Sequence, residues 1–444
     1  MLARHGARIP EASEIIDLRT LDSFKKNIID NYKSGNYRNN DLRMCPADVN
    51  ILDGWKWNLM HNATSAGSPT SDGYLTTQRI AQAYRQRYPD LFTFNAYDYS
   101  FELPSSQVWQ GTYQAFTEGL FRQSADNLNF PKTNNDTLFK AHETCPVWIR
   151  DVKENNATLT QYEMFKSSKG YRDMIANISQ RLGFNYNIES KFVDLMYEMC
   201  RYNTAWDTTQ ISPWCAAFTT EDLKRLEYAE DLKTYYTQGY GSYLNQKVAC
   251  PLITNMMKFF KDIVQDPTKA GEFTLDIPNF HKLDTDVESC NNTKSSFTPC
   301  TPKQPRVMIR FTDDPMYLMA LSALGAHRDG TPLTADGYNT PQAINRKWMT
   351  STIDPFNANV AAVLYRCNPV NPENQFKVLF LENEYPMTLD ECRVGLCDWS
   401  VMSRRYGGIS ETCDMQFCNG AGAVNGYVGL CIALAAFFMG ITGL

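Results

Sequence analysis

The sequence lacks the patterns that mark metal-binding and nucleic-acid-binding proteins. Only five of its 444 residues are histidine, and none of the thirteen cysteines forms a Cys-x-x-Cys pair, so no metal site is indicated. No long run of lysine or arginine occurs, and the net charge of -6 argues against nucleic acid as a partner. Internal repeats and low-complexity linkers are absent as well. We therefore expect a globular protein without a metal site.

An N-terminal leader is also missing. Met1 stands three residues before Arg4, which opens the motif described below, and no signal peptide precedes it. Only Met1-Leu2-Ala3 remain to form a first strand. We therefore expect this sequence to be N-terminally incomplete, with a truncated first strand.

The composition supports a large folded core. Hydrophobic residues make up 43% of the chain and charged residues 21%, which is typical of globular proteins. At this length we expect one large domain or two interleaved domains. The cysteine count favours disulfides, and therefore an oxidising compartment.

Glycosylation sequons indicate the same compartment. The sequence has five of them, at Asn62, Asn135, Asn156, Asn177 and Asn291. A chain of this length carries one or two by chance, so the number supports entry into the secretory pathway without proving it.

The C-terminus predicts a lipid anchor. Residues 427–444 are almost wholly apolar and end with the chain, and the small residues Asn419-Gly420-Ala421 precede them by a short spacer. This order is typical of a GPI-anchor signal, so we predict attachment at Asn419 and removal of the segment 419–444. The alternative is a tail-anchored helix, which is less favoured because no Lys or Arg follows the apolar run. Removal of Cys431 would leave twelve cysteines, an even number.

The catalytic chemistry is expected in Arg4-His5-Gly6-Ala7-Arg8-Ile9-Pro10. The guanidinium group offers a planar fork of donors that matches phosphate oxygens, and a neutral imidazole is a nucleophile near about pH 5 to 7. We therefore predict that Arg4 and Arg8 hold a phosphoryl group while His5 attacks the phosphorus. The alternative is a basic turn on a surface loop with no catalytic role.

This motif is the signature of the histidine acid phosphatases, and the chain resembles the multiple inositol polyphosphate phosphatase branch of that family. The resemblance covers roughly residues 1–390 and includes the segments 212–215, 226–228, 231–233, 239–241, 364–367 and 383–384. It implies an α/β fold, with a mixed sheet flanked by helices and a mainly helical cap. It also implies a phosphohistidine on His5, a distal acid that protonates the leaving alcohol, and no cofactor. The implied substrates are small phosphomonoesters, with inositol polyphosphates first and bisphosphoglycerate as a further candidate.

Periodicity and turn signals predict strands separated by helices, with functional groups at the carboxyl ends of the strands. The expected strands cover residues 97–103, 307–311, 359–367 and 375–381. Thr219 and Asp222 fit a capping box that opens a helix. Asp314 fits the N-cap of the helix that follows the strand 307–311.

The expected organisation has five parts. They are a first part of the α/β core (1–126), a helical cap (127–247), a second part of the core (248–391), an irregular cysteine-rich tail (392–418) and the anchor signal (419–444).

Two positions depart from the family pattern. Val108 stands where the family's spacing places a further phosphate-binding arginine. Matching without gaps through the end of the helix after 307–311 places Asp313 at the family's distal histidine and Asp314 at its distal acid. Asp314 is then either the acid that protonates the leaving group or only a helix cap, whereas Asp313 is more simply a solvated loop carboxylate.

Other side chains could replace the missing charges. None of the remaining histidines lies at the distal junction in the sequence; these are His61, His142, His281 and His327. The candidates are Arg310, the nearest arginine before the distal site in the sequence, and Arg328, the nearest after it. Two functions therefore stay open: an extracellular phosphomonoesterase with reduced or acid-shifted activity, and a GPI-anchored pseudophosphatase that binds phosphorylated ligands without turnover.

Overall fold

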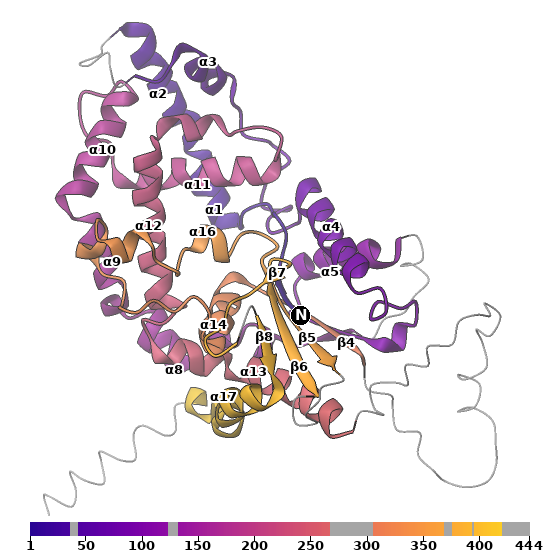
Figure 1. Cartoon of the computed structure of the whole chain (residues 1–444). Coiled ribbons are helices and arrows are strands. Elements are labelled where there is room, and N and C mark those ends of the chain that lie inside the picture. The colour runs from indigo at the N-terminus through magenta and orange to yellow at the C-terminus, as the bar shows by residue number, and fades with distance from the viewer. Residues whose placement is uncertain (36–42, 123–131, 267–304, 368–374, 393–394, 420–444) are drawn as a thin grey trace, which may run out of the picture.

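The structure is a computed structural model that describes residues 1–35, 43–122, 132–266, 305–367, 375–392 and 395–419. The predicted sequon at Asn291, His281 and the apolar segment 427–444 lie outside these residues. Figure 1 shows a helical body beside a twisted sheet whose faces are covered by further helices.

One mixed sheet forms the frame of the molecule. Its strand order is β3-β2-β4-β1-β5-β6-β7, and β8 pairs with β6. The strands are β1 (Leu2–Arg4), β2 (Tyr99–Leu103), β3 (Lys132–Asn134), β4 (Val307–Thr312), β5 (Asn359–Arg366), β6 (Phe376–Glu382), β7 (Tyr385–Pro386) and β8 (Leu396–Asp398). The four strands predicted from the sequence are confirmed as β2, β4, β5 and β6.

The short strand β1 lies at the centre of this sheet. It pairs in parallel with β4, with Arg4 opposite Thr312, and antiparallel with β5. Strand β2 is also parallel to β4. The carboxyl ends of β1, β4 and β2 therefore meet at one edge of the sheet, which brings the segments after Arg4, Thr312 and Leu103 together.

The alternation of side chains along β1 places its residues in two separate cores. Ala3 packs on one face with Phe101, Phe116 and Phe311, whereas Leu2 packs on the other face with Met316 and its neighbours. Helices cover both faces. This is the expected α/β class.

The helices fall into a group on the sheet and a helical body. They are α1 (Ala12–Arg19), α2 (Leu21–Ser34), α3 (Pro46–Gly54), α4 (Ser71–Arg87), α5 (Gln107–Phe121), α6 (Asp136–Phe139), α7 (Ala141–Thr144), α8 (Pro146–Trp148), α9 (Thr160–Lys166), α10 (Lys169–Arg181), α11 (Ser190–Trp206), α12 (Thr220–Thr237), α13 (Tyr243–Gln265), α14 (Asp314–Leu324), α15 (Pro341–Ile344), α16 (Thr350–Ile353) and α17 (Trp399–Thr412). In Figure 1 the helices α1–α3 lie with α10–α12 in the helical body. The predicted capping box of Thr219 and Asp222 opens α12.

Two local predictions were wrong. Asp313, not Asp314, is the N-cap of α14, because its backbone is extended and its carboxylate accepts a hydrogen bond from the Met316 amide at 3.2 Å. Asp314 is the first residue of that helix. The tail beyond Cys392 is not irregular throughout, because α17 forms there and buries Met402 and Tyr406, four residues apart on one helix face.

Four disulfides join cysteines that are distant in the sequence or flank a turn. The pairs are Cys145–Cys418, Cys200–Cys215, Cys250–Cys413 and Cys392–Cys397. Two of them tie the segment after α17 to α13 and to the turn before α8. The prediction that the cysteines serve as disulfides is therefore confirmed for these eight residues.

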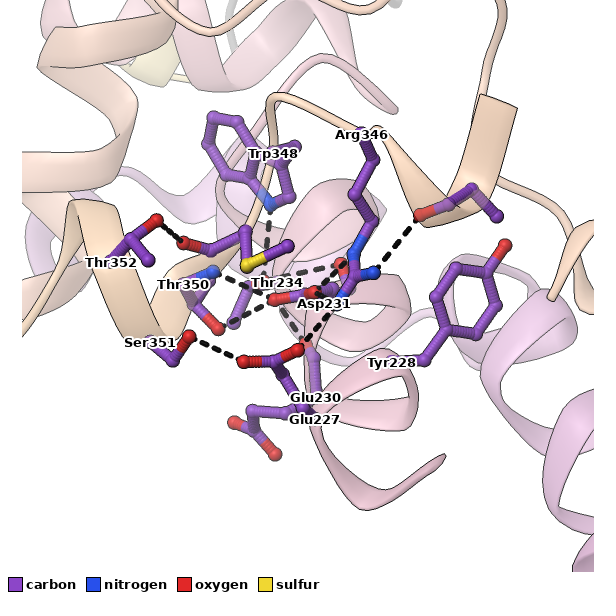
Figure 2. Close-up of polar contacts among 12 residues, drawn as sticks. Glu227, Tyr228, Glu230, Asp231, Thr234, Arg346, Trp348, Thr350, Ser351 and Thr352 are labelled. Atoms are coloured by element: carbon purple, nitrogen blue, oxygen red, sulfur yellow. Dashed lines mark hydrogen bonds and ion pairs between the residues drawn. The ribbon is translucent and has the colours of Figure 1, made fainter. Parts of the chain in front are cut away.

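A buried polar cluster joins α12 to the segment 346–357, which contains α16 and leads into β5 (Figure 2). Asp231 on α12 is fully buried, and both of its oxygens are used. Its Oδ1 accepts from the backbone N–H and the hydroxyl of Thr350 at 2.8 and 2.7 Å, and its Oδ2 accepts from Nε of Arg346 at 2.6 Å. Arg346 also donates to Glu227 at 2.9 Å. These bonds fix the start of α16, whose end leads directly to Asp354 and Phe356.

We expect Asp231→Ala to lower the free energy of unfolding by on the order of 3–5 kcal/mol, because it leaves the buried Arg346 without one of its two carboxylates. Glu230→Ala is the matched control on the same helix, since the Glu230 side chain is 32% exposed and pairs with Lys233 at 3.7 Å; we expect a loss below about 1 kcal/mol. Urea denaturation of both variants measures the difference. Equal losses would contradict a bracing role for the cluster.

Candidate active site

The motif loop is held in place by a close approach of two glycines. The loop leaves β1 at Arg4 and packs against the first turn of α4. A Cβ on Gly6 would lie 2.6 Å from the Gly73 carbonyl oxygen, and a Cβ on Gly73 would lie 2.0 Å from the carbonyl oxygen of Ala7. Neither position admits a side chain without moving the backbone. The Thr70 amide, at the N-cap of α4, donates to the same Ala7 carbonyl at 2.9 Å.

His5 is buried at the floor of the site, with 5% of its surface exposed. Its Nδ1 lies 2.9 Å from the Gly6 carbonyl oxygen, which can only accept a hydrogen bond. Nδ1 therefore carries the hydrogen and Nε2 carries the free electron pair. The rings of Trp109 and Phe356 pack against the imidazole, with distances between ring centres of 5.3 and 5.8 Å. Burial, together with the charges of Arg4 and Arg8, lowers the pKa of His5 to about 3, so the ring is neutral above that pH.

Arg4 is held from the far side of the site by the segment after α16. Its Nη1 donates to the Asp354 carbonyl oxygen at 2.6 Å and lies 3.1 Å from that residue's carboxylate. Both side chains are nearly buried, at 14% and 8% exposure. The guanidinium also lies 5.0 Å from the centre of the Phe356 ring. Its Nη2 is 4.0 Å from Asp314.

Arg8, three residues after His5 in the motif, faces two carboxylates. Its Nη1 is 3.4 Å from both Glu11 and Glu14. Its backbone carbonyl accepts a hydrogen bond from the Trp206 indole at 2.9 Å, which ties the motif loop to the end of α11. The charges of both predicted arginines act on His5, but each arginine already has acidic partners.

The distal acids lie at the start of α14, where β4 ends. Asp314 is partly open to solvent, with 42% of its side chain exposed. Desolvation acts to raise its pKa, but the Arg4 charge and the His5 ring outweigh it, so the pKa of Asp314 lies below its usual value. Asp313 is more buried, at 15% side-chain exposure. Burial, and then the neighbouring Asp314 charge, raise its pKa to about 8.

His142 lies at this junction in space, although it is far from it in the sequence. Its Nε2 is 3.5 Å from a carboxylate oxygen of Asp313. Its position in the sequence gave no sign of this contact. Helix α7 carries His142 and follows β3 closely, so the parallel pairing of β3 with β2 brings it to the same sheet edge as Asp313.

The other substitutes suggested by the sequence lie elsewhere. Arg310 donates to Glu102 at 2.6 Å, and Arg328 lies 5.7 Å from the centre of the Tyr240 ring. Val108 stands in the first turn of α5, one residue before Trp109. Its side chain packs close to Gly67, because a Cβ on Gly67 would lie 2.9 Å from Cγ2 of Val108. An apolar side chain therefore occupies this edge of the site, close to Glu11.

Sequence reasoning missed Asp354 and Phe356, which follow α16. No local pattern marks them, since they lie about 350 residues from Arg4. The signal that could have found them is the strand β5, which starts three residues after Phe356 and pairs with β1.

The predicted modification sites have different surroundings. Asn156 and Asn177 are exposed, whereas the Asn62 and Asn135 side chains are partly buried and hydrogen-bonded locally. Asn419 is exposed at the last described position. Among the described residues, no helix is both long and apolar enough to cross a membrane.

Known proteins resemble this chain over most of its length. The family model described as histidine phosphatase superfamily (branch 2) matches residues 1–381. "Multiple inositol polyphosphate phosphatase 1" of Drosophila melanogaster is 32% identical over 425 residues, which cover 95% of this chain and 81% of that protein. The Homo sapiens protein of the same name is 26% identical over 93% of this chain and 79% of its own.

Solved structures confirm the fold. The phytase from D. castellii superimposes with a TM-score of 0.65 at 16% identity, over 94% of this chain and 80% of its own. The Bifidobacterium longum multiple inositol polyphosphate phosphatase, in complex with inositol hexasulfate, gives a TM-score of 0.60 at 14% identity, over 88% and 87% of the two chains. With the family model matching most of its residues, the chain belongs to branch 2 of the histidine phosphatase superfamily.

Proposed function

We propose that this protein hydrolyses phosphomonoesters, with inositol polyphosphates as the main substrate class. The observation that carries the proposal is the neutral His5 at the carboxyl end of the central strand, whose Nε2 keeps a free electron pair and which lies within the electrostatic reach of both Arg4 and Arg8. This arrangement supplies a nucleophile and two cationic donors at one point. The names of its relatives favour inositol polyphosphates as the substrate class.

The proposed reaction has two steps. First, Nε2 of His5 forms a bond to phosphorus while the ester P–O bond breaks, and Asp314 gives its proton to the leaving oxygen. Second, a water molecule attacks the phosphorus of the phosphohistidine and returns a proton to Asp314, which releases phosphate and restores His5. Arg4 and Arg8 stabilise the negative charge on the phosphoryl oxygens in both steps.

The charge state of Asp314 favours work at acidic pH. Its pKa lies below the usual value in the free protein. A bound phosphate dianion would share the Arg4 charge and repel an ionised carboxylate, so substrate binding raises the proton affinity of Asp314. The proton that the leaving group requires is then available at low pH.

A binding protein without turnover is the second candidate. Val108 supplies no charge at its edge of the site, and the Glu11 and Glu14 carboxylates compete with phosphate for Arg8. Removing one electrostatic partner commonly costs an enzyme about a hundredfold to a thousandfold in rate. A pocket that still binds phosphate but reacts slowly would fit these features.

We expect His5→Ala to lower phosphate release from inositol hexakisphosphate by more than about a thousandfold, because it removes the nucleophile. Purified protein is assayed at roughly pH 4 to 7, the range in which general acids of this type work. His61→Ala is the matched control, since His61 is a partly exposed histidine whose ring meets Trp206 edge to face; we expect its rate to stay within about twofold. Equal, unmeasurable rates in folded wild-type and His5→Ala protein would favour the binding protein.

The lowered pKa of His5 predicts that kcat/KM, plotted against pH, declines only at an unusually acidic pH. His5 attacks only when neutral, and with a pKa of about 3 it remains neutral down to acidic pH. We expect kcat/KM to fall only below the pH range in which an ordinary histidine protonates. Arg8→Gln removes one of the charges that lower this pKa, so the decline should move to higher pH while kcat/KM falls. An unmoved decline would show that another group sets it.

We also propose that the protein is exported and lipid-anchored, which rests on the sequons, the disulfides and the apolar C-terminal run. The chain expressed in animal cells behind a foreign signal peptide should appear at the cell surface. Phosphatidylinositol-specific phospholipase C should release it, and a variant ending at Cys418 should be secreted. Surface protein that resists the lipase would contradict a GPI anchor and favour a spanning tail.

A further inference from the structure

His142 is a buried histidine beside the proposed site that the proposed reaction leaves without a role. It lies on α7, with 7% of its side chain exposed, and the Trp148 ring packs against it at 5.5 Å. Its Nε2 faces two carboxylates, Asp313 at 3.5 Å and Glu143 at 4.0 Å. Its Nδ1 has no hydrogen-bond partner in the described part of the chain.

The other charges around this pair come from three elements. Lys140 stands just before α7 and pairs with Glu143 at 3.2 Å, and Lys153 in the turn after α8 acts on His142 from a greater distance. Asp314 lies beside Asp313 on α14 and is 4.0 Å from Arg4. The Met316 amide occupies the second oxygen of Asp313. Among the described residues, His142 is the one ion-pairing partner within 4 Å of Asp313.

This arrangement creates an electrostatic problem for phosphate binding. Asp313 and Asp314 are adjacent, and only Asp314 has an arginine nearby. If both were ionised, a phosphate dianion held by Arg4 and His5 would meet two negative charges at the distal edge. A buried carboxylate without a cationic partner is unfavourable even before a phosphate arrives.

We propose that His142 is a positioning residue that accepts a hydrogen bond from protonated Asp313, so that this carboxyl stays neutral while phosphate is bound. The proposal rests on the proposed function for its link to catalysis. The Asp313–His142 pair then leaves Asp314 as the only acid at the start of α14 that titrates in the working pH range. His142 does not touch the reacting atoms in this scheme and acts through Asp313.

The pH range over which the pair is neutral follows from its surroundings. Burial, and then Asp314, raise the pKa of Asp313 to about 8, and burial lowers that of His142 to about 4. Between these values the carboxyl holds its proton and the imidazole is uncharged. Above about pH 8, Asp313 ionises and repels an anionic ligand. The pair should therefore impose an alkaline limit on anion binding.

The test measures anion binding without turnover. Myo-inositol hexasulfate is a suitable probe because sulfate stays ionised at every pH used, so any pH dependence belongs to the protein. Its affinity for the His5→Ala variant is measured by calorimetry between pH 5 and about pH 9, which brackets the titration of a carboxyl raised to this range. We expect binding to weaken roughly tenfold on the alkaline side, the effect of one added like charge.

Three variants in the His5→Ala background locate the group that titrates. Asp313→Asn should abolish the alkaline weakening. His142→Ala should move it to lower pH, because loss of the acceptor and entry of water both favour the ionised acid. In the Asp313→Asn background, His142→Ala should leave the pH profile unchanged. If His142→Ala does not fold, His142→Asn makes the same comparison.

Each other outcome overturns the proposal. A shift from His142→Ala that persists in the Asp313→Asn background would place the titrating group elsewhere. A profile altered by EDTA or by added Mn²⁺ would indicate a cation between His142, Glu143 and Asp313 in place of the proton. Failure of hydrolysis with the expected binding profile would overturn the proposed function alone, whereas absence of hexasulfate binding at every pH would overturn both.

Discussion

The buried ion pair of Arg4 and Asp354 is the interaction on which the rest of the site depends. Arg4 ends the central strand, and Asp354 directly follows α16, which is hydrogen-bonded to α12. The pair therefore joins the sheet to the helical body. The residues after Asp354 also hold His5. Phe356 packs against its ring, and the backbone N–H of Asn357 donates a hydrogen bond to the His5 carbonyl oxygen at 2.9 Å. A guanidinium buried without its carboxylate would be strongly unfavourable. The hydrogen bonds between Asp231 and the start of α16 therefore help to position His5 as well as to stabilise the fold.

Much of this arrangement could be predicted because it is local in the sequence. The alternation and spacing of apolar residues gave strands β2, β4, β5 and β6, and the capping box gave the start of α12. The motif gave Arg4, His5 and Arg8 together, because seven consecutive residues on one loop must lie close in space. The one-residue error at α14 arose because Asp313 and Asp314 have the same side chain, so only the backbone conformation decides which of them caps the helix.

The remaining site residues could not be predicted because they meet only through the pairing of strands. Asp354 reaches Arg4 because β5 runs antiparallel to β1, and His142 reaches Asp313 because β3 extends the parallel half of the sheet beyond β2. Neither contact leaves a periodic signal in one sequence. The contact between Arg310 and Glu102 could not be predicted for the same reason, since the two residues face each other on the neighbouring parallel strands β4 and β2. Residue type alone suggested a role for Arg310 that its strand position rules out.

The balance of charge at the site explains why a loss of basic groups does not by itself predict a loss of function. Two arginines face four carboxylates, Asp313 lies next to one of these acids, and Val108 adds no positive charge. Counted as fully ionised groups, this set would repel a phosphate. Burial lowers the number of negative charges, because it raises the pKa of Asp313 to about 8 and this carboxyl therefore keeps its proton below that pH. The proton that Asp313 keeps is therefore part of the phosphate site, and this set of residues binds an anion best at a pH below the pKa of Asp313.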